Sequence, residues 1–354
     1  MALVLLRGLE RSSWSEEASG AADFPAVSVV IAVRNEEDNI LELLKSLQTQ
    51  DYSNFDVVIV DDASSDNTRG IAEDFCRNKT NFRVIPAAEN TFGWGPKKNA
   101  IHTGILHSRG EIILTTDADC RPQSGWIRGI TAKFTGEIGA VVGYSPLIFD
   151  NTIAGRLKSL EALAAAIIAA AFIGEGKPFL AAGRSFAYRR SLYLEIGGFG
   201  ESGSAPAGDD DLLLQRIGKY TKTAFSFDLN TIVPSYPEAG DYIARKRRHF
   251  AVAKRYPLPF ILAGAVVFLL IAGITALIIL GLITFAFGLL TAGVCAFILK
   301  VICDYILLSR GAKKLGDGFR HSDMILAELI QIPYTLILQP LSFIGKIKWR
   351  GRKL

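Results

Sequence analysis

The sequence has few cysteines, and none of them has the spacing of a metal or redox site. Four are present among 354 residues, Cys76, Cys120, Cys295 and Cys303, and no two form a Cys-x-x-Cys pair. Paired spacing of that kind marks zinc sites and redox centres. The sequence therefore predicts neither, and we expect reduced thiols with a packing role.

A large charge imbalance is also missing. The formal net charge is only +4, and many of the basic residues lie in two clusters. The clusters comprise Arg245, Lys246, Arg247, Arg248, Lys254 and Arg255, and then Lys346, Lys348, Arg350, Arg352 and Lys353. No nucleic-acid motif accompanies them, so nucleic-acid binding is not expected. Basic clusters beside membrane segments instead favour the cytoplasmic side of a membrane.

Apolar residues, by contrast, are abundant, and they predict a membrane region. Hydrophobic residues make up 49% of the chain. The apolar run at 258–308 is too long for a soluble surface and must enter a bilayer, so we expect two transmembrane helices within residues 257–308. The apolar start, residues 1–6, is too short for a signal peptide or a span. Residues 1–24 are therefore expected to form a polar N-terminal segment.

The segments around the two predicted spans leave the topology open. We expect a basic interfacial helix at 236–256, a basic loop at 309–323, a third transmembrane or re-entrant segment at 324–345, and a basic tail at 346–354. A third full span would place the basic tail outside, against the charge bias. Glu328 and Gln331 would also make that span a poor lipid-facing helix.

Alternating strand and helix patterns predict an α/β domain over residues 25–235. Strands are expected at 27–33, 55–60, 82–86, 111–116 and 140–144, with helices after Asn35, at 67–75 and at 97–107. Strands separated by helices imply parallel pairing with right-handed crossovers in a three-layer domain. The apolar segment 157–173 is expected to be a helix that is buried in this domain or lies on the membrane.

Polar residues gather where the predicted strands end. They are Asn35, Asp61, Asp62, Lys97, Asp117 and Asp119. Ligands bind at the carboxyl ends of parallel strands, so we expect these side chains to share a site. Two of them also fit plainer roles, because Asn35 could cap the helix that follows and Asp61 could belong to a turn. A lysine at a helix start, such as Lys97, suggests an anionic partner.

The sequence Asp117-Ala118-Asp119 predicts a site for a divalent cation and a diphosphate. Its two carboxylates lie on the same side of the chain, at the exposed end of a buried strand. Mg²⁺ and Mn²⁺ take oxygen ligands, which zinc does not favour. We expect Mg²⁺ or Mn²⁺ bound directly by Asp119, with Asp117 nearer the nucleotide.

Five motifs in this order resemble glycosyltransferase family 2, the inverting GT-A enzymes. They lie at 27–36, 60–68, 95–100, 115–119 and 208–213. The resemblance covers residues 25–255, and the tail Trp349-Arg350-Gly351-Arg352 is similar to that of the bacterial membrane-bound branch. It implies a GT-A fold, a Rossmann-like three-layer α/β domain of nucleotide-diphospho-sugar transferases, with a C-terminal α-helical membrane region.

The resemblance also implies roles for single residues. Nucleotide-sugar binding would fall to Asn35, Glu36, Asp61, Asp62, Lys97, Asp117 and Arg248. The general base on the acceptor hydroxyl falls on Asp210, with Asp209 as the competitor. A carboxylate held among other carboxylates has a raised proton affinity, which suits a base.

Some positions depart from the family pattern. Arg245 and His249 replace the glutamine and tryptophan that usually flank the arginine matched by Arg248, and Ser185 stands where asparagine is common. The first two changes argue against a processive polymer channel. The third means that sugar specificity cannot be copied from the family.

These features predict a multi-pass protein of the inner, cytoplasmic membrane with its catalytic domain in the cytoplasm. The expected reaction moves a sugar from a nucleotide-diphosphate sugar, most simply a UDP-sugar, to a lipid, lipid-linked or envelope-glycan acceptor. One alternative is a processive polysaccharide synthase. Another, from a different class, is a non-catalytic membrane scaffold that keeps the GT-A fold.

Overall fold

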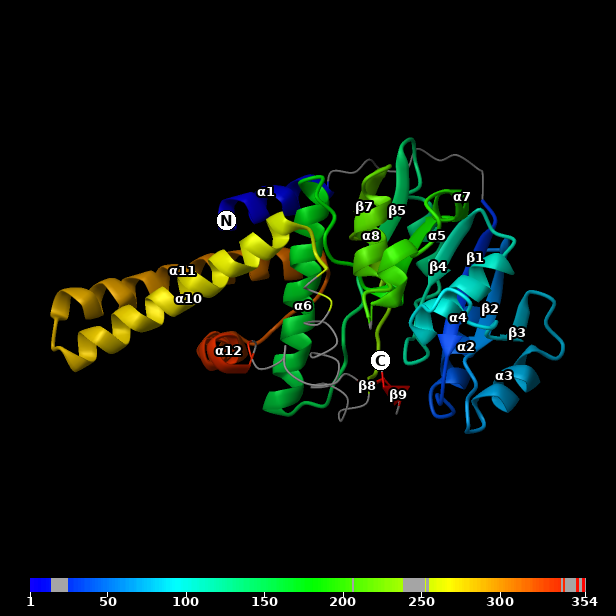
Figure 1. Ribbon diagram of the computed structural model, residues 1–354, viewed down its shortest axis with the longest axis horizontal. Coiled ribbons are helices and arrows are strands. Elements are labelled where there is room, and N and C mark those ends of the chain that lie inside the picture. The colour runs from blue at the N-terminus through cyan, green and yellow to red at the C-terminus, as the bar shows by residue number, and fades with distance from the viewer. Residues whose placement is uncertain are drawn as a thin grey trace.

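The structure is a computed structural model that describes residues 1–13, 25–205, 207–237, 252, 255–338, 340, 348–349 and 352–353. Figure 1 shows an α/β body at one end of the molecule and a long helical hairpin that projects from the other. The helix α6 runs between the two parts, across the direction of the hairpin. Arg248 and most of the predicted interfacial helix 236–256 lie outside the described residues.

A seven-stranded sheet forms the centre of the α/β body. Its strands are β1 (Val27–Val33), β2 (Phe55–Asp61), β3 (Phe82–Pro86), β4 (Ile112–Thr115), β5 (Ile138–Gly143), β6 (Phe186–Arg189) and β7 (Lys222–Ser226). The order is β3-β2-β1-β4-β6-β5-β7. All neighbours are parallel except β6, which is antiparallel to both β4 and β5. The five predicted strands are confirmed, whereas β6 and β7 were not predicted.

Helices cover both faces of the sheet and make the three-layer arrangement predicted from the sequence. One face packs on α2 (Ile40–Gln48), α3 (Thr68–Cys76) and α5 (Trp126–Thr131). The other packs on α4 (Pro96–Leu106), α6 (Ile153–Gly174), α7 (Arg190–Glu195) and α8 (Asp211–Ile217). Strand β1 contributes to both cores, Val29 and Ile31 to one and Val30 to the other, because successive side chains of a strand point to opposite faces.

The start of the chain differs from the prediction of a polar segment over residues 1–24. Residues Ala2–Ser13 form a helix, α1, that packs on α6, and Leu9 is fully buried between them. The two helices approach closely, since a Cβ on Gly8 would lie 2.1 Å from the carbonyl oxygen of Ala171. The prediction was wrong here because the apolar residues of 1–13 are too few for a span but suffice to face another helix.

The two predicted spans correspond to the two helices of the hairpin. It consists of α10 (Leu258–Ile283) and α11 (Phe287–Lys314), both long and apolar enough to cross a membrane. A turn around Phe285, which has a φ of 55°, joins them. The predicted basic loop at 309–323 begins later than expected, because α11 continues to Lys314. By length and composition α6 is a third candidate span, but its apolar face belongs to the core of the α/β body.

The segment expected at 324–345 begins as α12 (His321–Pro333), followed by a π-helical turn at Tyr334–Leu338. Among the described helices α12 is not one of those long and apolar enough to span a membrane. Figure 1 shows it end-on beside the hairpin, so its axis lies across those of α10 and α11.

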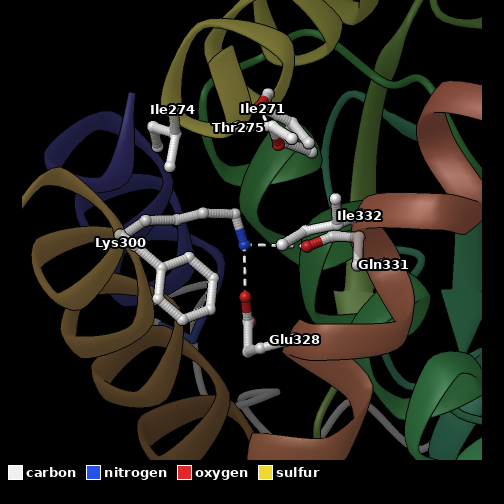
Figure 2. Close-up of a pocket in the computed structure, with 8 residues that line it drawn as sticks. Ile271, Ile274, Thr275, Lys300, Glu328, Gln331 and Ile332 are labelled. Carbon is white, nitrogen blue, oxygen red and sulfur yellow. Dashed lines mark hydrogen bonds and ion pairs between the residues drawn. The ribbon is translucent and has the colours of Figure 1, made fainter. Parts of the chain in front are cut away.

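Charged contacts hold α12 in this position. On one side, Arg156 of α6 donates to Asp323 at 2.7 Å. On the other, the ammonium of Lys300 in α11 bonds Glu328 and also Gln331, at 2.7 Å (Figure 2). The same ammonium pairs at 2.8 Å with Asp304, which lies four residues further along α11 and so on the same side of the helix.

Candidate active site

The predicted site residues lie at the carboxyl edge of β1, β2 and β4, as expected from parallel strands. Asn35 and Glu36 follow β1, Asp61 and Asp62 close β2, and Asp117 and Asp119 follow β4. Lys97 lies in the first turn of α4, and Asp209 and Asp210 directly precede α8. Residues from separate parts of the chain therefore meet at one edge of the sheet.

Lys97 joins two of these groups directly. Its Nζ lies 2.8 Å from Oδ1 of Asp117 and 3.0 Å from Oδ2 of Asp209. Burial alone would lower the pKa of Lys97, but the charges of Asp117 and Asp209 outweigh it and hold that pKa above its usual value. Lys97 is therefore a permanent cation between the end of β4 and the acidic run. In the structure its anionic partners are two carboxylates of the protein itself, and binding of a nucleotide-sugar by Lys97 stays a prediction.

The three aspartates 209–211 have three different environments. Burial would raise the pKa of Asp209, but Lys97 and Lys98 lower it below its ordinary value. Burial and the neighbouring charge of Asp209 raise the pKa of Asp210. Burial and the charge of Asp210 raise that of Asp211 well above its usual range. Within the run, Asp209 is therefore ion-paired with Lys97, and Asp210 has an increased affinity for protons.

Hydrogen bonds fix the direction of the Asp210 carboxylate. Its Oδ2 accepts from the N–H of Gly183 at 2.9 Å, and its Oδ1 accepts from the N–H of Asp211 at 2.8 Å, as a cap of α8. Gly183 approaches closely, since a Cβ there would lie 3.3 Å from Oδ2 of Asp210. The hydroxyl of Thr115, at the end of β4, donates to the carbonyl of Gly183 at 2.9 Å and so links this contact to the sheet.

The residues after β1 and β2 form a connected pair of loops. Oδ1 of Asn35 accepts from the N–H of Ser65 at 2.8 Å, and Asn35 has a φ of 52°. Asp61 is buried and accepts from the N–H of Ser64 at 3.3 Å. These contacts shape the edge on which a nucleotide would lie. Asn35 does not cap α2, whose N-cap is Asn39.

Glu36 and Asp62 lie in the same pair of loops. Oε2 of Glu36 accepts from Nδ2 of Asn39 at 3.0 Å. The backbone carbonyl of Asp62 accepts from Arg34 at 2.5 Å, and its side chain is half-buried.

Asp117 and Asp119 offer oxygen ligands at the end of β4, with buried Ala118 between them. Oδ2 of Asp119 accepts from the hydroxyl of Ser235 at 3.1 Å, which orients the carboxylate. Among the described residues no group of three or more His, Cys, Asp or Glu side chains could hold a metal alone. Carboxylate oxygens are the ligands that hard cations such as Mg²⁺ prefer.

Several residues that build the site could not be predicted from the sequence. Lys98, Ser235 and Tyr256 all bond to site residues or to the loop before them. None lies in a motif with a recognised spacing, and their roles depend on contacts between distant segments. Only the doubled lysine 97–98 beside a predicted strand-end site could have drawn attention to Lys98.

Comparison with known proteins shows what this chain is similar to. Residues 28–197 match the family described as Glycosyl transferase family 2. Glycosyltransferase AglE of Haloferax volcanii is 34% identical over 130 residues, which are 36% of this chain and 41% of that protein. Beta-monoglucosyldiacylglycerol synthase of Nostoc sp. is 30% identical over 131 residues, 36% of this chain and 27% of that protein. The chain thus spans less than half the length of either relative.

A solved structure with the same fold covers almost the whole chain. It is mannosyltransferase PcManGT from Pyrobaculum calidifontis, in complex with GDP-Man and Mn²⁺. The likeness extends over 96% of this chain and 94% of that one, with a TM-score of 0.58 and 20% identity. At this identity the comparison establishes the fold, which is that of the GT-A transferases.

Proposed function

We infer that this chain, whose residues 28–197 match the model of glycosyl transferase family 2, is a membrane-bound, metal-dependent, inverting glycosyltransferase. Its donor would be a nucleotide-diphosphate sugar, with UDP-sugars as the first candidates. Its acceptor would be a hydroxyl group of a lipid or of a lipid-linked glycan. The observation that carries the proposal is the pairing of Lys97 with both Asp117 and Asp209, which places a cation, the end of β4 and the acidic run together.

The donor would lie along the carboxyl edge of the sheet. Asp61 and Asp62, with Asn35 and Glu36 beside them, would hold the base and ribose. Asp119 and Asp117 would hold Mg²⁺ or Mn²⁺, which when bound would offset the charge on the departing nucleoside diphosphate. Lys97 would add a second positive charge beside the diphosphate.

Asp210 would act as the general base. Its raised pKa and its two backbone hydrogen bonds give an oriented carboxylate with an increased proton affinity. It would take the proton of the acceptor hydroxyl while that oxygen attacks the anomeric carbon from the face opposite the diphosphate. The bond from the anomeric carbon to the diphosphate oxygen breaks, and the nucleoside diphosphate leaves with the electron pair. Asp209, already paired with Lys97, is the poorer base.

The membrane acceptor is supported by contacts between the acidic run and the start of α10. The hydroxyl of Tyr256 donates to Asp211 at 2.8 Å, and Arg255 donates to the hydroxyl of Ser204 at 3.1 Å. Both residues immediately precede the membrane helix that starts at Leu258. The proposed base therefore lies next to Asp211, whose partner Tyr256 is two residues before α10. At this place a hydroxyl group of a membrane lipid would be close to the base.

One experiment tests this function directly. The purified full chain in vesicles of bacterial polar lipids would be given radiolabelled UDP-glucose, UDP-N-acetylglucosamine and GDP-mannose in separate reactions with MnCl₂. We expect label in the lipid extract for at least one donor, and none after addition of EDTA. Long polymeric product would favour the processive synthase, and absence of both label and nucleotide binding would favour a scaffold.

A further inference from the structure

Lys98 is a buried cation that the proposed reaction does not use. Lys98 is only 2% exposed, and its Nζ donates to three backbone carbonyls. The acceptors are the oxygens of Ser202 at 2.8 Å, Ala205 at 2.9 Å and Ala207 at 2.8 Å. An ammonium has three N–H groups, so these bonds satisfy all of its donors.

The three carbonyls belong to the segment that leads into the acidic run. This segment, the 200–208 loop, starts with the 3₁₀ turn Gly200–Ser204 and ends at Gly208, directly before Asp209. The loop is held against α4 at a second point, where the N–H of Gly95 donates to the carbonyl of Gly203 at 2.9 Å. The Trp94 ring packs directly against Gly203, since a Cβ on Gly203 would lie 2.1 Å from Cδ1 of that ring.

The adjacent lysines of α4 act on the same run in two ways. Neighbouring residues of a helix project in directions about 100° apart, so two consecutive side chains reach different partners. Lys97 reaches the carboxylate of Asp209, whereas Lys98 reaches the backbone before it. One helix turn therefore fixes both the side chain and the main chain at the entry to the acidic run.

Opposing effects act on the charge of Lys98. Burial lowers the pKa of Lys98 to about 8, while the charges of Asp209 and Asp210 act in the opposite direction. Carbonyl dipoles converging on one ammonium stabilise its charge in a buried place. Without the ammonium, buried carbonyls such as that of Ala205 would lose their donor.

We propose that Lys98 is a positioning residue, which fixes the course of the 200–208 loop so that Asp210 meets Gly183 and Asp209 meets Lys97. The catalytic consequence rests on the proposed function of Asp210. The structural consequence does not, because the contact between Asp210 and Gly183 can be observed without a substrate.

The structural part is tested by hydrogen–deuterium exchange of the full chain in detergent micelles. Peptides that contain residues 181–185 report the N–H groups of Ala181 and Gly183, which donate to Asp211 and Asp210. In Lys98→Met we expect exchange in these peptides to rise by about tenfold or more. Lys79→Met is the matched control, since the ammonium of Lys79 also donates to a backbone carbonyl, that of Phe75, far from the loop in the chain. Unchanged exchange at 181–185 in Lys98→Met would overturn the proposal.

The catalytic part uses the same variants. Affinity for UDP with MnCl₂, measured by calorimetry, should stay within about threefold of wild type, while kcat for sugar transfer falls by about tenfold or more. Lys98→Gln keeps two N–H donors without the charge, so its kcat should lie between that of Lys98→Met and that of wild type. This variant replaces Lys98→Met in the test if Lys98→Met does not fold. Wild-type kcat in both variants would refute the positioning role. The two proposals can fail separately. If wild type transfers no sugar but Lys98→Met still loses protection at 181–185, the proposed function is overturned and the positioning role of Lys98 stands.

Discussion

The hydroxyl of Tyr256 donates a 2.8 Å hydrogen bond to Oδ2 of Asp211, and this bond joins the acidic run to the base of α10. Asp211 is almost completely buried, and its other oxygen accepts from the N–H of Ala181 at 2.8 Å. Val252, Leu212 and Ala205 form a small apolar cluster beside this bond. The segment that holds the proposed base is therefore packed against the residues that lead into α10.

Tyr256→Phe should destabilise this junction. The change keeps the ring but removes the donor from a buried carboxylate, for which we expect a loss of about 1 to 3 kcal/mol in the free energy of unfolding. Thermal unfolding of the full chain in detergent would measure it. Tyr220→Phe is the control, because Tyr220 is 68% exposed. Equal melting temperatures for both variants would contradict the importance of the bond.

Asp211→Asn should become more stable relative to wild type as the pH rises. Burial and the charge of Asp210 raise the pKa of Asp211 well above its ordinary 3.8, so the folded state binds this proton more tightly than the unfolded state. The stability from this group is complete below the ordinary pKa and is lost as the pH rises through the folded value. The asparagine cannot ionise and avoids that loss. Melting temperatures of both proteins at pH 5 and pH 8 test this. The melting temperature of Asp211→Asn minus that of wild type should be higher at pH 8 than at pH 5, and a lower value at pH 8 would contradict the prediction.

The pH profile of sugar transfer should depend on Asp209. A general base must be deprotonated, so kcat should fall as the pH is lowered through the raised pKa of Asp210. After burial, the charge of Asp209 is the largest cause of that raised pKa. Asp209→Asn removes this charge and should shift the acidic limb of the profile to lower pH. A shift to higher pH would show that Asp210 is not the titrating base.

Asp119→Asn should abolish metal-dependent nucleotide binding without unfolding the protein. The amide keeps the volume and can still accept from Ser235, but it lacks the charge that holds the cation. We expect the affinity for UDP in MnCl₂ to fall by at least about tenfold in calorimetric titrations. Ser235→Ala, which leaves the carboxylate in place, should bind far better than Asp119→Asn. An affinity equal to that of wild type in Asp119→Asn would remove Asp119 from the metal site.

The C-terminus should lie on the same side of the membrane as the α/β body. Asp323 ties one end of α12 to Arg156 of α6, and Gln331 ties the other end to Lys300 of α11. These contacts hold α12 across the hairpin (Figure 1). A reporter fused after Leu354 should therefore be active on the cytoplasmic side, and added protease should spare the α/β body in intact cells. An external reporter would show that 324–345 spans the membrane.

The predictable part of the fold is local in origin. The run 27–33 is apolar and β-branched throughout, and β1 occupies those residues with almost every side chain buried. The sequence also predicted the helices α10 and α11, because long apolar runs leave few alternatives. The four residues of β6 were not predicted, since their pairing with β4 joins residues more than 70 positions apart.

The site was predictable where a motif carried it and not where packing did. Asp117, Asp209 and Lys97 lie in motifs, and the structure brings them into direct contact. The partners that orient them do not lie in motifs. Gly183 contacts Asp210, and Lys98 holds the loop, only because distant segments fold together.

The most direct test of the proposed active site compares Asp210→Asn with Asp211→Asn. Both replace one carboxylate of the same run by an amide, but only Asp210 is proposed to act on the acceptor. Asp210→Asn should bind UDP with MnCl₂ as wild type does and should transfer sugar slower by a factor of about 10² to 10⁴, whereas Asp211→Asn should transfer at a rate close to wild type. Equal rates in the two variants, or loss of UDP binding in Asp210→Asn, would contradict the account and move the base elsewhere.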